Sequence, residues 1–404
     1  MMKEYFDGLE AGLRQAIADG KGSPRKLYSL ELARLGQRLY SGQHKVAWCG
    51  ITAPFDLLNV MEVTSCFVEF IGAMLASTGG VGDFIEQTEH IGYSSDSCSY
   101  HRAVSGAALK GLMPKPEFLI GTTSPCSGGL AVIENLAAHF GKRMFVLNIP
   151  QDESRENVDY LAEQIRSLAD FVTEITGLPL NPDRLRDAVE KTNRAREIMI
   201  EVYELAKQIP SPVTSKDLSN FGVVMALFLG TEAGIGVAES YRDELKKRRQ
   251  GITEAAAREK FRLLWVQNRI QFKNPVEKLL EQEYGAKIVV DELNDITWEP
   301  VDTAHIYEGL ARRSISIPIN GSIRNRVRHL QKMAEEYRID GAINPCNWGC
   351  RQGTGARGMI EDGFREIGIP VLNLEVDCID HRKFTEGQIK TRIEAFLEMV
   401  GNRK

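Results

Sequence analysis

Cys98 is the residue whose setting best suits chemistry. It lies in the stretch Gly92-Tyr-Ser-Ser-Asp-Ser-Cys-Ser-Tyr-His-Arg102, among small and hydroxyl-bearing residues and just ahead of a histidine and an arginine. Such surroundings can stabilise a thiolate, which is both a nucleophile and a metal ligand. A free cysteine is also among the most frequently buried residue types, so a packing role is the alternative for Cys98 taken alone.

The other cysteines add weight to a metal or catalytic role. They are Cys49, Cys66, Cys126, Cys346, Cys350 and Cys378. The N-terminus carries early acidic residues and no apolar signal segment, so we expect a cytoplasmic protein. Structural disulfides are rare in a reducing compartment, which favours metal binding or catalysis for these thiols.

Alternating strand and helix patterns predict two parallel α/β units. Ligands gather at the carboxyl ends of the strands in such sheets. Five cysteines lie within a few residues of the carboxyl end of an expected strand, which predicts a thiolate-ligated centre between the two units. These cysteines are Cys49, Cys126, Cys346, Cys350 and Cys378. The expected strands are 45–51, 117–121, 143–150, 261–266, 287–291, 340–344 and 369–375.

Composition and patterning set the domain plan and exclude two kinds of partner. The 404 residues are 43% hydrophobic, enough for a large core. A net charge of −5 gives no general basic surface for nucleic acid. The longest apolar run, Val223–Leu229, is too short for a membrane span, which needs about 20 residues. We expect an N-terminal helical segment at 1–40, a first α/β domain at 41–153, a helical region at 154–257 and a second α/β domain at 258–404.

The cysteine spacing limits the kind of metal. Cys346 and Cys350 are separated by three residues, unlike the pairs of a zinc ribbon, and no histidine stands at zinc-finger distance. Thiolates that converge from separate loops are compatible with an iron–sulfur cluster.

The segment Glu89-His-Ile-Gly-Tyr-Ser-Ser-Asp-Ser-Cys-Ser-Tyr-His-Arg102 resembles the signature around the first cluster cysteine in one enzyme family. The family is that of the subunits of 2-hydroxyacyl-CoA dehydratases and ATP-dependent benzoyl-CoA reductases. The similarity covers nearly the full chain, and its Gly-Tyr-Ser-x-Asp-x-Cys-Ser-Tyr string is the specific part. It extends through the Cys126 loop, Phe261–Trp265, Asn347–Arg351, Ile369–Asp377 and Arg392–Glu398.

The resemblance implies two flavodoxin-like α/β domains with a helical segment between them, holding an oxygen-sensitive [4Fe–4S] cluster. Carried over by position, its ligands are Cys98, Cys126 and Cys350, with Cys346 competing for the third place. Three protein ligands would leave one iron open to a small ligand or the substrate.

The resemblance also implies partners and a reaction. We expect a related second catalytic subunit, an ATP-hydrolysing iron–sulfur activator that injects one electron, and an acyl-CoA substrate. In a dehydratase the electron reaches the thioester carbonyl, and the ketyl radical anion expels the neighbouring hydroxyl. In a benzoyl-CoA reductase the electrons reduce an aromatic ring instead. No P-loop or dinucleotide fingerprint is found, which fits ATP use on the partner.

Glu69 and Thr52 are the candidate catalytic residues. Glu69 stands in the apolar run Cys66-Phe-Val-Glu-Phe-Ile-Gly72, which should raise its pKa toward the useful acid–base range. By the resemblance it falls where the family's smaller subunit has an active-site glutamate; the alternative is a surface glutamate at a helix end. Thr52 matches the region where relatives place a hydroxyl near the open iron, and a turn-forming role is its alternative.

Three other interpretations stay open. Cys49, Cys66 and Cys378 are surplus to one cubane, which keeps a double-cubane [8Fe–9S] reductase of small molecules as an alternative, although 312–320 lacks the cysteines expected there. A second is a pairing subunit that only relays electrons. A third is a cluster-free scaffold with cysteines in its core.

Overall fold

The computed structural model describes residues 2–219, 221–252 and 259–403. Its first sheet is wholly parallel, with strand order β2-β1-β3-β4. Every residue of β2 and β3 is buried, as expected when helices cover both faces of a parallel sheet. The strands are β1 (Lys45–Cys49), β2 (Val63–Phe67), β3 (Phe118–Thr122) and β4 (Met144–Leu147).

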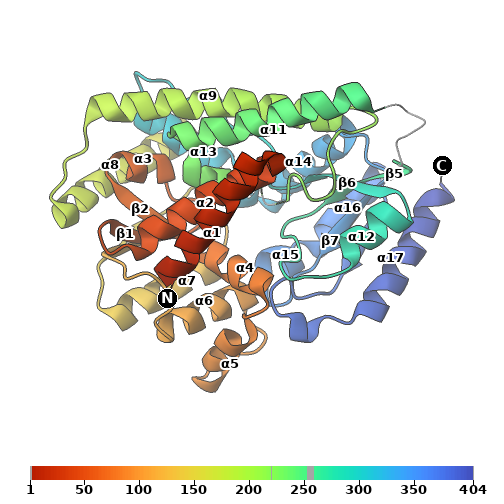
Figure 1. The fold of residues 1–404 in the computed structure, drawn as a ribbon, viewed down its shortest axis with the longest axis horizontal. Helices are drawn as coiled ribbons and strands as arrows, with labels where there is room; N and C mark the ends of the chain where they lie inside the picture. The colour runs from red at the N-terminus through yellow and green to blue at the C-terminus, as the bar shows by residue number, and fades with distance from the viewer. Residues whose placement is uncertain (1, 220, 253–258, 404) are drawn as a thin grey trace.

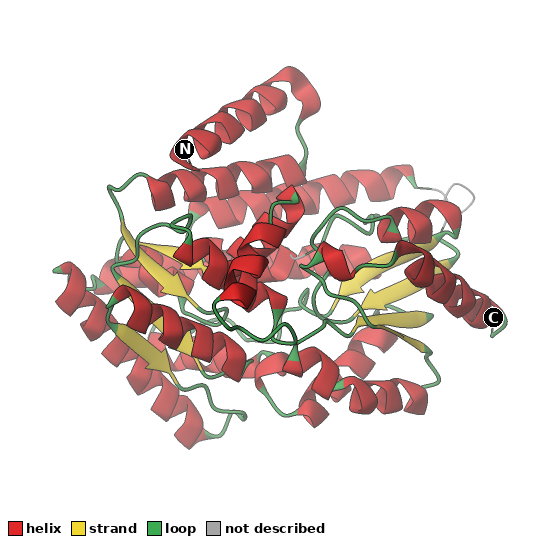
Figure 2. Cartoon of the chain, turned by 90° about the horizontal axis from the view of Figure 1, so that it is seen from below, coloured by secondary structure: helices red, strands yellow, loops and turns green. Residues whose placement is uncertain are grey.

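The second sheet repeats this plan with the order β6-β5-β7-β8, again all parallel. Both orders match the first four strands of a flavodoxin-like sheet, so the predicted α/β fold class is confirmed. Figure 2 shows the two sheets in opposite halves of the molecule, with helices around each. The strands are β5 (Phe261–Trp265), β6 (Ala286–Asp291), β7 (Gly341–Pro345) and β8 (Val371–Leu374).

The helices of the first half connect its strands and carry two of the candidate cysteines at their starts. Cys98 directly precedes α6 and Cys126 directly precedes α7. The N-terminal helices α1 and α2 pack against each other as a hairpin whose turn contains Gly20 at φ 75°. These helices are α1 (Met2–Ala16), η1 (Ile17–Lys21), α2 (Pro24–Tyr40), α3 (Phe55–Val60), α4 (Val68–Thr78), α5 (Gly82–His90), α6 (Ser99–Leu109) and α7 (Ser127–Phe140).

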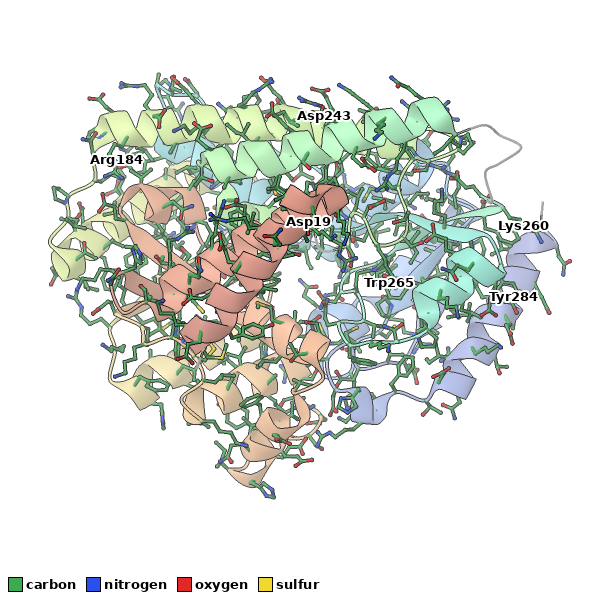
Figure 3. All side chains as sticks on the ribbon, in the orientation of Figure 1. Asp19, Arg184, Asp243, Lys260, Trp265 and Tyr284 are labelled. Atoms are coloured by element: carbon green, nitrogen blue, oxygen red, sulfur yellow. The ribbon has the colours of Figure 1, made fainter. Side chains whose placement is uncertain are left out.

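Long helices follow β4 and run across both halves. In Figure 1, α9 and α11 lie side by side along the top of the molecule. Figure 3 shows charged side chains along them, including Arg184 and Asp243. The guanidinium of Arg166 on α8 binds Glu308 at 2.9 Å, and α8 packs on both β4 and α13. These helices are α8 (Arg155–Thr176), α9 (Pro182–Lys207), α10 (Phe221–Met225), η2 (Ala226–Phe228) and α11 (Glu232–Gly251).

The remaining helices surround the second sheet. Cys350 directly precedes the short helix α15. Within the part of the chain that is described, no helix has both the length and the apolar character needed to cross a membrane. These helices are α12 (Val276–Lys278), η3 (Leu279–Glu283), α13 (Ile306–Ser316), η4 (Pro318–Asn320), α14 (Ile323–Glu336), α15 (Arg351–Gly355), α16 (Arg357–Glu366), η5 (His381–Lys383) and α17 (Glu386–Gly401).

One strand was absent from the sequence expectation. The residues after Pro54 are expected to be helix-like, yet β2 (Val63–Phe67) separates two helices, Phe55–Val60 and Val68–Thr78. The seven strands that were expected are all present, each within a few residues of its expected bounds. The missing strand matters for the site, because β2 ends directly before the helix that carries Glu69.

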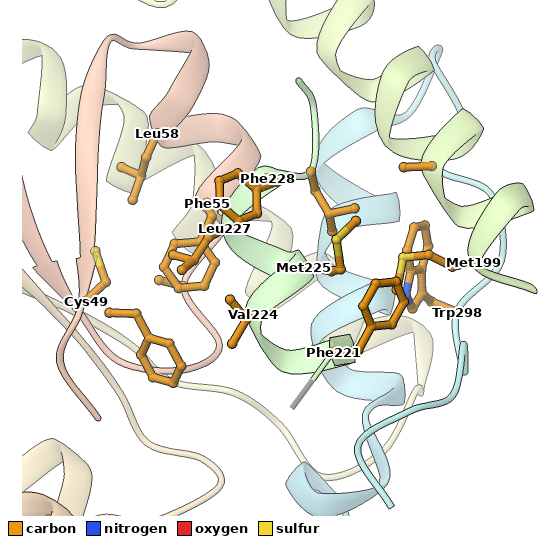
Figure 4. Close-up of a cluster of buried hydrophobic side chains, with 14 of the residues drawn as sticks. Cys49, Phe55, Leu58, Met199, Phe221, Val224, Met225, Leu227, Phe228 and Trp298 are labelled. Atoms are coloured by element: carbon orange, nitrogen blue, oxygen red, sulfur yellow. The ribbon is translucent and has the colours of Figure 1, made fainter. Parts of the chain in front are cut away.

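The core joins the first half to the long helices. Figure 4 shows Cys49 and Phe55 of the first half close to Val224 and Leu227, with Met199 and Trp298 at the other end of the cluster. Cys49 is fully buried in this core. The core therefore fixes the loop after β1, which leads directly to the candidate site.

Candidate functional site

The loops that follow the strands of both sheets enclose one large cavity, of about 850 Å³. In each sheet the strand order reverses direction beside its first strand, between β1 and β3 and between β5 and β7. This switch point is where open α/β sheets bind ligands. The cavity wall includes Ile51 and Pro125 from loops of the first sheet and Gln267 and Gly349 from loops of the second.

Cys98, Cys126 and Cys350 all line this cavity. They come from three separate loops, and each stands immediately before the first turn of a helix. The long helices α6 and α7 direct backbone N–H groups and the positive ends of their dipoles toward two of these sulfurs. The chain therefore brings the three expected ligands to one cavity.

The sulfur atoms in the cavity accept hydrogen bonds. The Gly353 N–H donates to the Cys350 Sγ at 3.4 Å, and the Gln267 side-chain amide donates to the same sulfur at 3.7 Å. Burial raises the pKa of the Cys98 and Cys350 thiols, while backbone hydrogen bonds at each sulfur act to lower it. A thiolate in this cavity therefore needs a cationic partner, and a bound metal supplies one.

Three of the other cysteines use their thiols as donors instead. Cys346 donates to the Asn373 side-chain carbonyl at 3.6 Å, and Cys378 donates to the backbone carbonyl of Asn268 at 3.7 Å. Cys49 donates to the Ala47 carbonyl at 3.6 Å. None of these three is among the residues that line the cavity. A thiolate cannot make such bonds, so these contacts are those of protonated thiols.

Glu69 also lines the cavity, from the first turn of α4. Its Oε2 is buried and has no hydrogen-bond partner among the described residues. Burial raises the pKa of its carboxyl to about 7. A side chain on Gly129 would come within 3.1 Å of Glu69 Oε1, so the glycine lets α7 pack closely beside the carboxyl. The carboxyl is thus poised to exchange a proton near neutral pH.

His101 lies on the cavity wall beside Gly129 and its neighbour Gly128. Burial lowers the pKa of its imidazole to about 4, so the ring is neutral at neutral pH. Arg102 has a structural position: it is fully buried and binds Glu89 and the Ser97 carbonyl. Its guanidinium therefore anchors the Cys98 loop.

Thr52 lies outside the cavity that Cys98, Cys126 and Cys350 line, here called the cysteine cavity. Its hydroxyl donates to the Ser124 carbonyl at 3.1 Å, which ties the loop after β1 to the loop that holds Cys126. It lines a smaller neighbouring cavity. The geometry supports a loop-bracing contact for this hydroxyl.

Sequence reasoning missed two glutamines. Gln267 follows β5, is 4% exposed and has a left-handed backbone with φ 60°, which is unusual for a residue other than glycine. The side-chain amide of Gln352 donates to the carbonyls of Pro125 and Ile319, each at 2.9 Å. The position of Gln267 just beyond the end of β5 could have marked it in the sequence as a candidate site residue. Nothing local marked Gln352.

The donor set agrees with a cluster better than with a single ion. Among the described residues, no three His, Cys, Asp or Glu side chains converge closely enough to hold one metal ion. In a cubane each cysteine binds a different iron, so its ligands can stand farther apart and come from separate loops. Three thiols around an 850 Å³ cavity suit that arrangement.

Lactoyl-CoA dehydratase subunit alpha of Anaerotignum propionicum is 24% identical over 88% of this chain and 90% of the relative. The (R)-phenyllactyl-CoA dehydratase alpha subunit of Clostridium sporogenes is 24% identical over 89% of this chain and 90% of its own. A subunit of the benzoyl-CoA reductase of Thauera aromatica is 24% identical over 87% of this chain and 86% of its own.

These relatives are all enzyme subunits. The family model described as 2-hydroxyglutaryl-CoA dehydratase, D-component, matches residues 50–400. The chain is therefore an enzyme subunit that belongs to the 2-hydroxyglutaryl-CoA dehydratase D-component family.

Proposed function

We propose that this chain is the iron–sulfur subunit of a 2-hydroxyacyl-CoA dehydratase. The observation that carries the proposal is the gathering of Cys98, Cys126, Cys350 and Glu69 around one cavity. Cys98, Cys126 and Cys350 would hold a [4Fe–4S] cluster, which supplies a low-potential electron when bound. The hydrogen bonds to the Cys350 sulfur support it over Cys346 as the third ligand.

Glu69 is the proton-handling group of this mechanism. Removing water from a 2-hydroxyacyl thioester requires a proton for the leaving hydroxyl and the loss of a proton from the adjacent carbon. With a pKa of about 7, the protonated carboxyl can give its proton to the hydroxyl, and the carboxylate can then accept the carbon proton. Over one cycle the carboxyl returns to its starting state, so the dehydration consumes no net proton.

Other groups of the cavity position the substrate and keep water away. Phe67, Phe70 and Val132 give the wall near Glu69 an apolar character. An apolar wall excludes water from a reactive intermediate and maintains the raised pKa of the carboxyl. His101 is neutral, so it offers a hydrogen bond without a competing charge.

The proposal includes partners. The relatives are named as subunits, and we propose that a related second subunit pairs with this chain, together with an ATP-hydrolysing iron–sulfur activator. A reductase of the benzoyl-CoA type is the second candidate function, favoured by the similarity to the benzoyl-CoA reductase chain of Thauera aromatica. The two differ in product: a dehydratase yields an enoyl thioester and water, whereas a reductase yields a reduced ring.

The test compares Glu69→Gln with the wild-type chain in the complete complex, with activator, ATP and reductant. We expect the variant to keep its full iron content but to lose about 10²- to 10⁴-fold in turnover of 2-hydroxyacyl-CoA, because the amide cannot exchange a proton. Glu134→Gln, on the exposed side of α7, is the matched control and should turn over normally. Normal turnover by Glu69→Gln would remove Glu69 from the mechanism.

A further inference from the structure

A second cavity, of about 160 Å³, adjoins the cysteine cavity. The two cavities share part of their walls, and one shared residue, Pro125, directly precedes Cys126. The smaller cavity therefore lies directly beside the place where a ligand near the cysteines would bind. The shared wall residues are Ile51, Pro125, Val223, Leu293 and Ile319.

The wall of the small cavity is mainly apolar. Phe55, Met199, Met225 and Trp298 line it and are buried in the core, where Figure 4 shows them among other apolar side chains. Two flexible methionines suit a wall that must fit the shape of a ligand. Such a lining favours an apolar occupant.

The fully charged groups at this wall already have partners. The Arg313 guanidinium binds both carboxylate oxygens of Asp56, at 2.7 and 2.8 Å. Glu292 is held in the same two-bond manner by Arg326, at 2.5 and 2.8 Å. Neither Arg313 nor Glu292 is left to compensate a charged ligand, so burying a carboxylate here would be costly.

Asp295 and His329 are the other titratable groups of the wall, beside the hydroxyls of Thr52, Thr297 and Ser314. His329 Nε2 lies 3.8 Å from Asp295 Oδ2 and has no hydrogen-bond partner among the described residues. Burial lowers the pKa of the imidazole and raises that of the carboxyl, which moves both groups toward their neutral forms. The cavity thus carries little net charge.

The size of the cavity points to a definite kind of group. A volume of about 160 Å³ is close to that of an engineered apolar cavity of about 150 Å³ that binds benzene. A phenyl ring or a branched alkyl group of similar bulk would fit.

We propose that the small cavity is the subsite for the acyl side chain of the substrate, and that this side chain is uncharged, apolar and about the size of benzene. The inference rests on the proposed function. It assigns the substrate class as 2-hydroxyacyl thioesters with an aromatic or branched alkyl side chain, as opposed to those with a side-chain carboxylate.

The first arm of the test needs no turnover. Toluene should raise the melting temperature of the wild-type chain and of Ala233→Phe, but not that of Ala226→Phe, in which the new ring fills the cavity. Ala226 lines the cavity, whereas Ala233 is a half-buried alanine outside it. If Ala226→Phe does not fold, Met199→Ala replaces it and should bind the larger 1-methylnaphthalene more tightly than the wild type. No toluene effect on the wild type would overturn the proposal.

The second arm measures kcat/KM in the complete complex with 2-hydroxyacyl-CoA thioesters that differ in their side chains. The wild type should prefer a phenyl side chain over a carboxylate side chain by at least about tenfold. One further substrate carries a methyl group in place of the phenyl group. Ala226→Phe should lower the ratio of kcat/KM for the phenyl substrate to that for the methyl substrate by about tenfold, and Ala233→Phe should leave this ratio unchanged. A preference for the carboxylate side chain, or an unchanged ratio in Ala226→Phe, would overturn the subsite.

The two arms separate the possible failures. If no 2-hydroxyacyl-CoA is turned over by iron-loaded complex, the proposed function fails and the acyl assignment fails with it, whatever toluene does. If turnover is observed but toluene does not bind, the proposed function survives and the subsite is overturned.

Discussion

Cys350 and Cys346 lie four positions apart and have opposite hydrogen-bonding roles. The Cys350 sulfur accepts hydrogen bonds from Gly353 and Gln267, while the Cys346 thiol donates to Asn373. A ligand sulfur carries negative charge and gains from donors. We therefore propose Cys350 over Cys346 as the ligand, a distinction that their spacing in the sequence could not make.

Gln267 should tune the cluster through its bond to the Cys350 sulfur. Replacing it with leucine removes an N–H donor that stabilises the more negative, reduced state, so the reduction potential should fall. A bond worth about 1 kcal/mol corresponds to about 40 mV for one electron. Gln271→Leu is the matched control, since Gln271 lines the same cavity and donates to the Arg269 carbonyl instead. Equal potentials in Gln267→Leu and the wild type, measured by a redox titration followed by electron paramagnetic resonance, would refute this role.

Glu69 makes a second prediction at the residue scale, on stability. Its pKa is about 7 in the folded chain, against 4.5 usually, so between these values the folded state holds a proton that the unfolded state has lost. Stability therefore falls as pH rises from about 4.5 to about 7, by at most about 3 kcal/mol, and stays low above that. Glu69→Gln has no carboxyl at this position, so its stability does not show this fall.

We expect Glu69→Gln to melt at a higher temperature than the wild type at pH 8 and at the same temperature near pH 4.5. The melting temperatures are to be measured by calorimetry on cluster-free protein, so that no iron alters the titration. A variant that melts below the wild type at pH 8 would show that the carboxylate is stabilised in the fold, contrary to the burial seen here.

At the scale of elements, Gln352 joins the loops that carry two cysteines. It lies in α15, two residues after Cys350, and its amide donates to the carbonyl of Pro125, which precedes Cys126. Arg326 on α14 donates to the Gln352 carbonyl at 3.0 Å, which holds this residue in place. The contact holds together the loops of two proposed ligands, Cys126 and Cys350, which follow strands of different sheets.

Gln352→Leu should therefore lower the iron content per chain beyond what its loss of stability alone would cause. Losing the amide should cost about 1 to 3 kcal/mol, because two part-buried carbonyls lose their donor. Gln331→Leu is the control: that amide donates to the Gly363 carbonyl at 2.7 Å, and the residue is not on the cavity wall. We expect similar melting temperatures for the two variants but reduced iron only in Gln352→Leu. Equal iron in both would mean that the contact is merely structural.

Most elements could be predicted because their signals are local. Buried runs such as Phe118–Thr122 and Phe261–Trp265 are apolar and followed by small-residue loops, as strands of parallel sheets are. The strand Val63–Phe67 was missed because it passes into α4 without a Gly or Pro between them. The apolar residues across this junction do not keep one regular spacing, so the pattern does not show where the strand ends and the helix begins.

The site could be predicted only in part. Cys98, Cys126, Cys350 and Glu69 were expected from motif and position, and all four line the cavity. The contacts of Gln267 and Gln352 depend on how distant loops meet, which no local pattern encodes. The same is true of Thr52, whose hydroxyl bonds to the Ser124 carbonyl, 72 positions away.

On the scale of the whole molecule, the chain uses one strand order twice. The switch points of the two sheets supply loops to a single cavity, so neither half completes the site alone. The long helices contact both halves, as the ion pair between Arg166 and Glu308 shows. The division at residues 40, 153 and 257 stays a prediction, and so do the second subunit and the activator.

The central claim is one cubane per chain, held by Cys98, Cys126 and Cys350. Its most direct test is the iron and acid-labile sulfide content per chain of protein purified without oxygen, for the wild type and for Cys350→Ser and Cys346→Ser. We predict about four iron and four sulfide per chain in the wild type and in Cys346→Ser, and loss of the cluster in Cys350→Ser. About eight iron per chain would instead indicate the double cubane, and full iron in Cys350→Ser, or none in the wild type after anoxic reconstitution, would contradict the account.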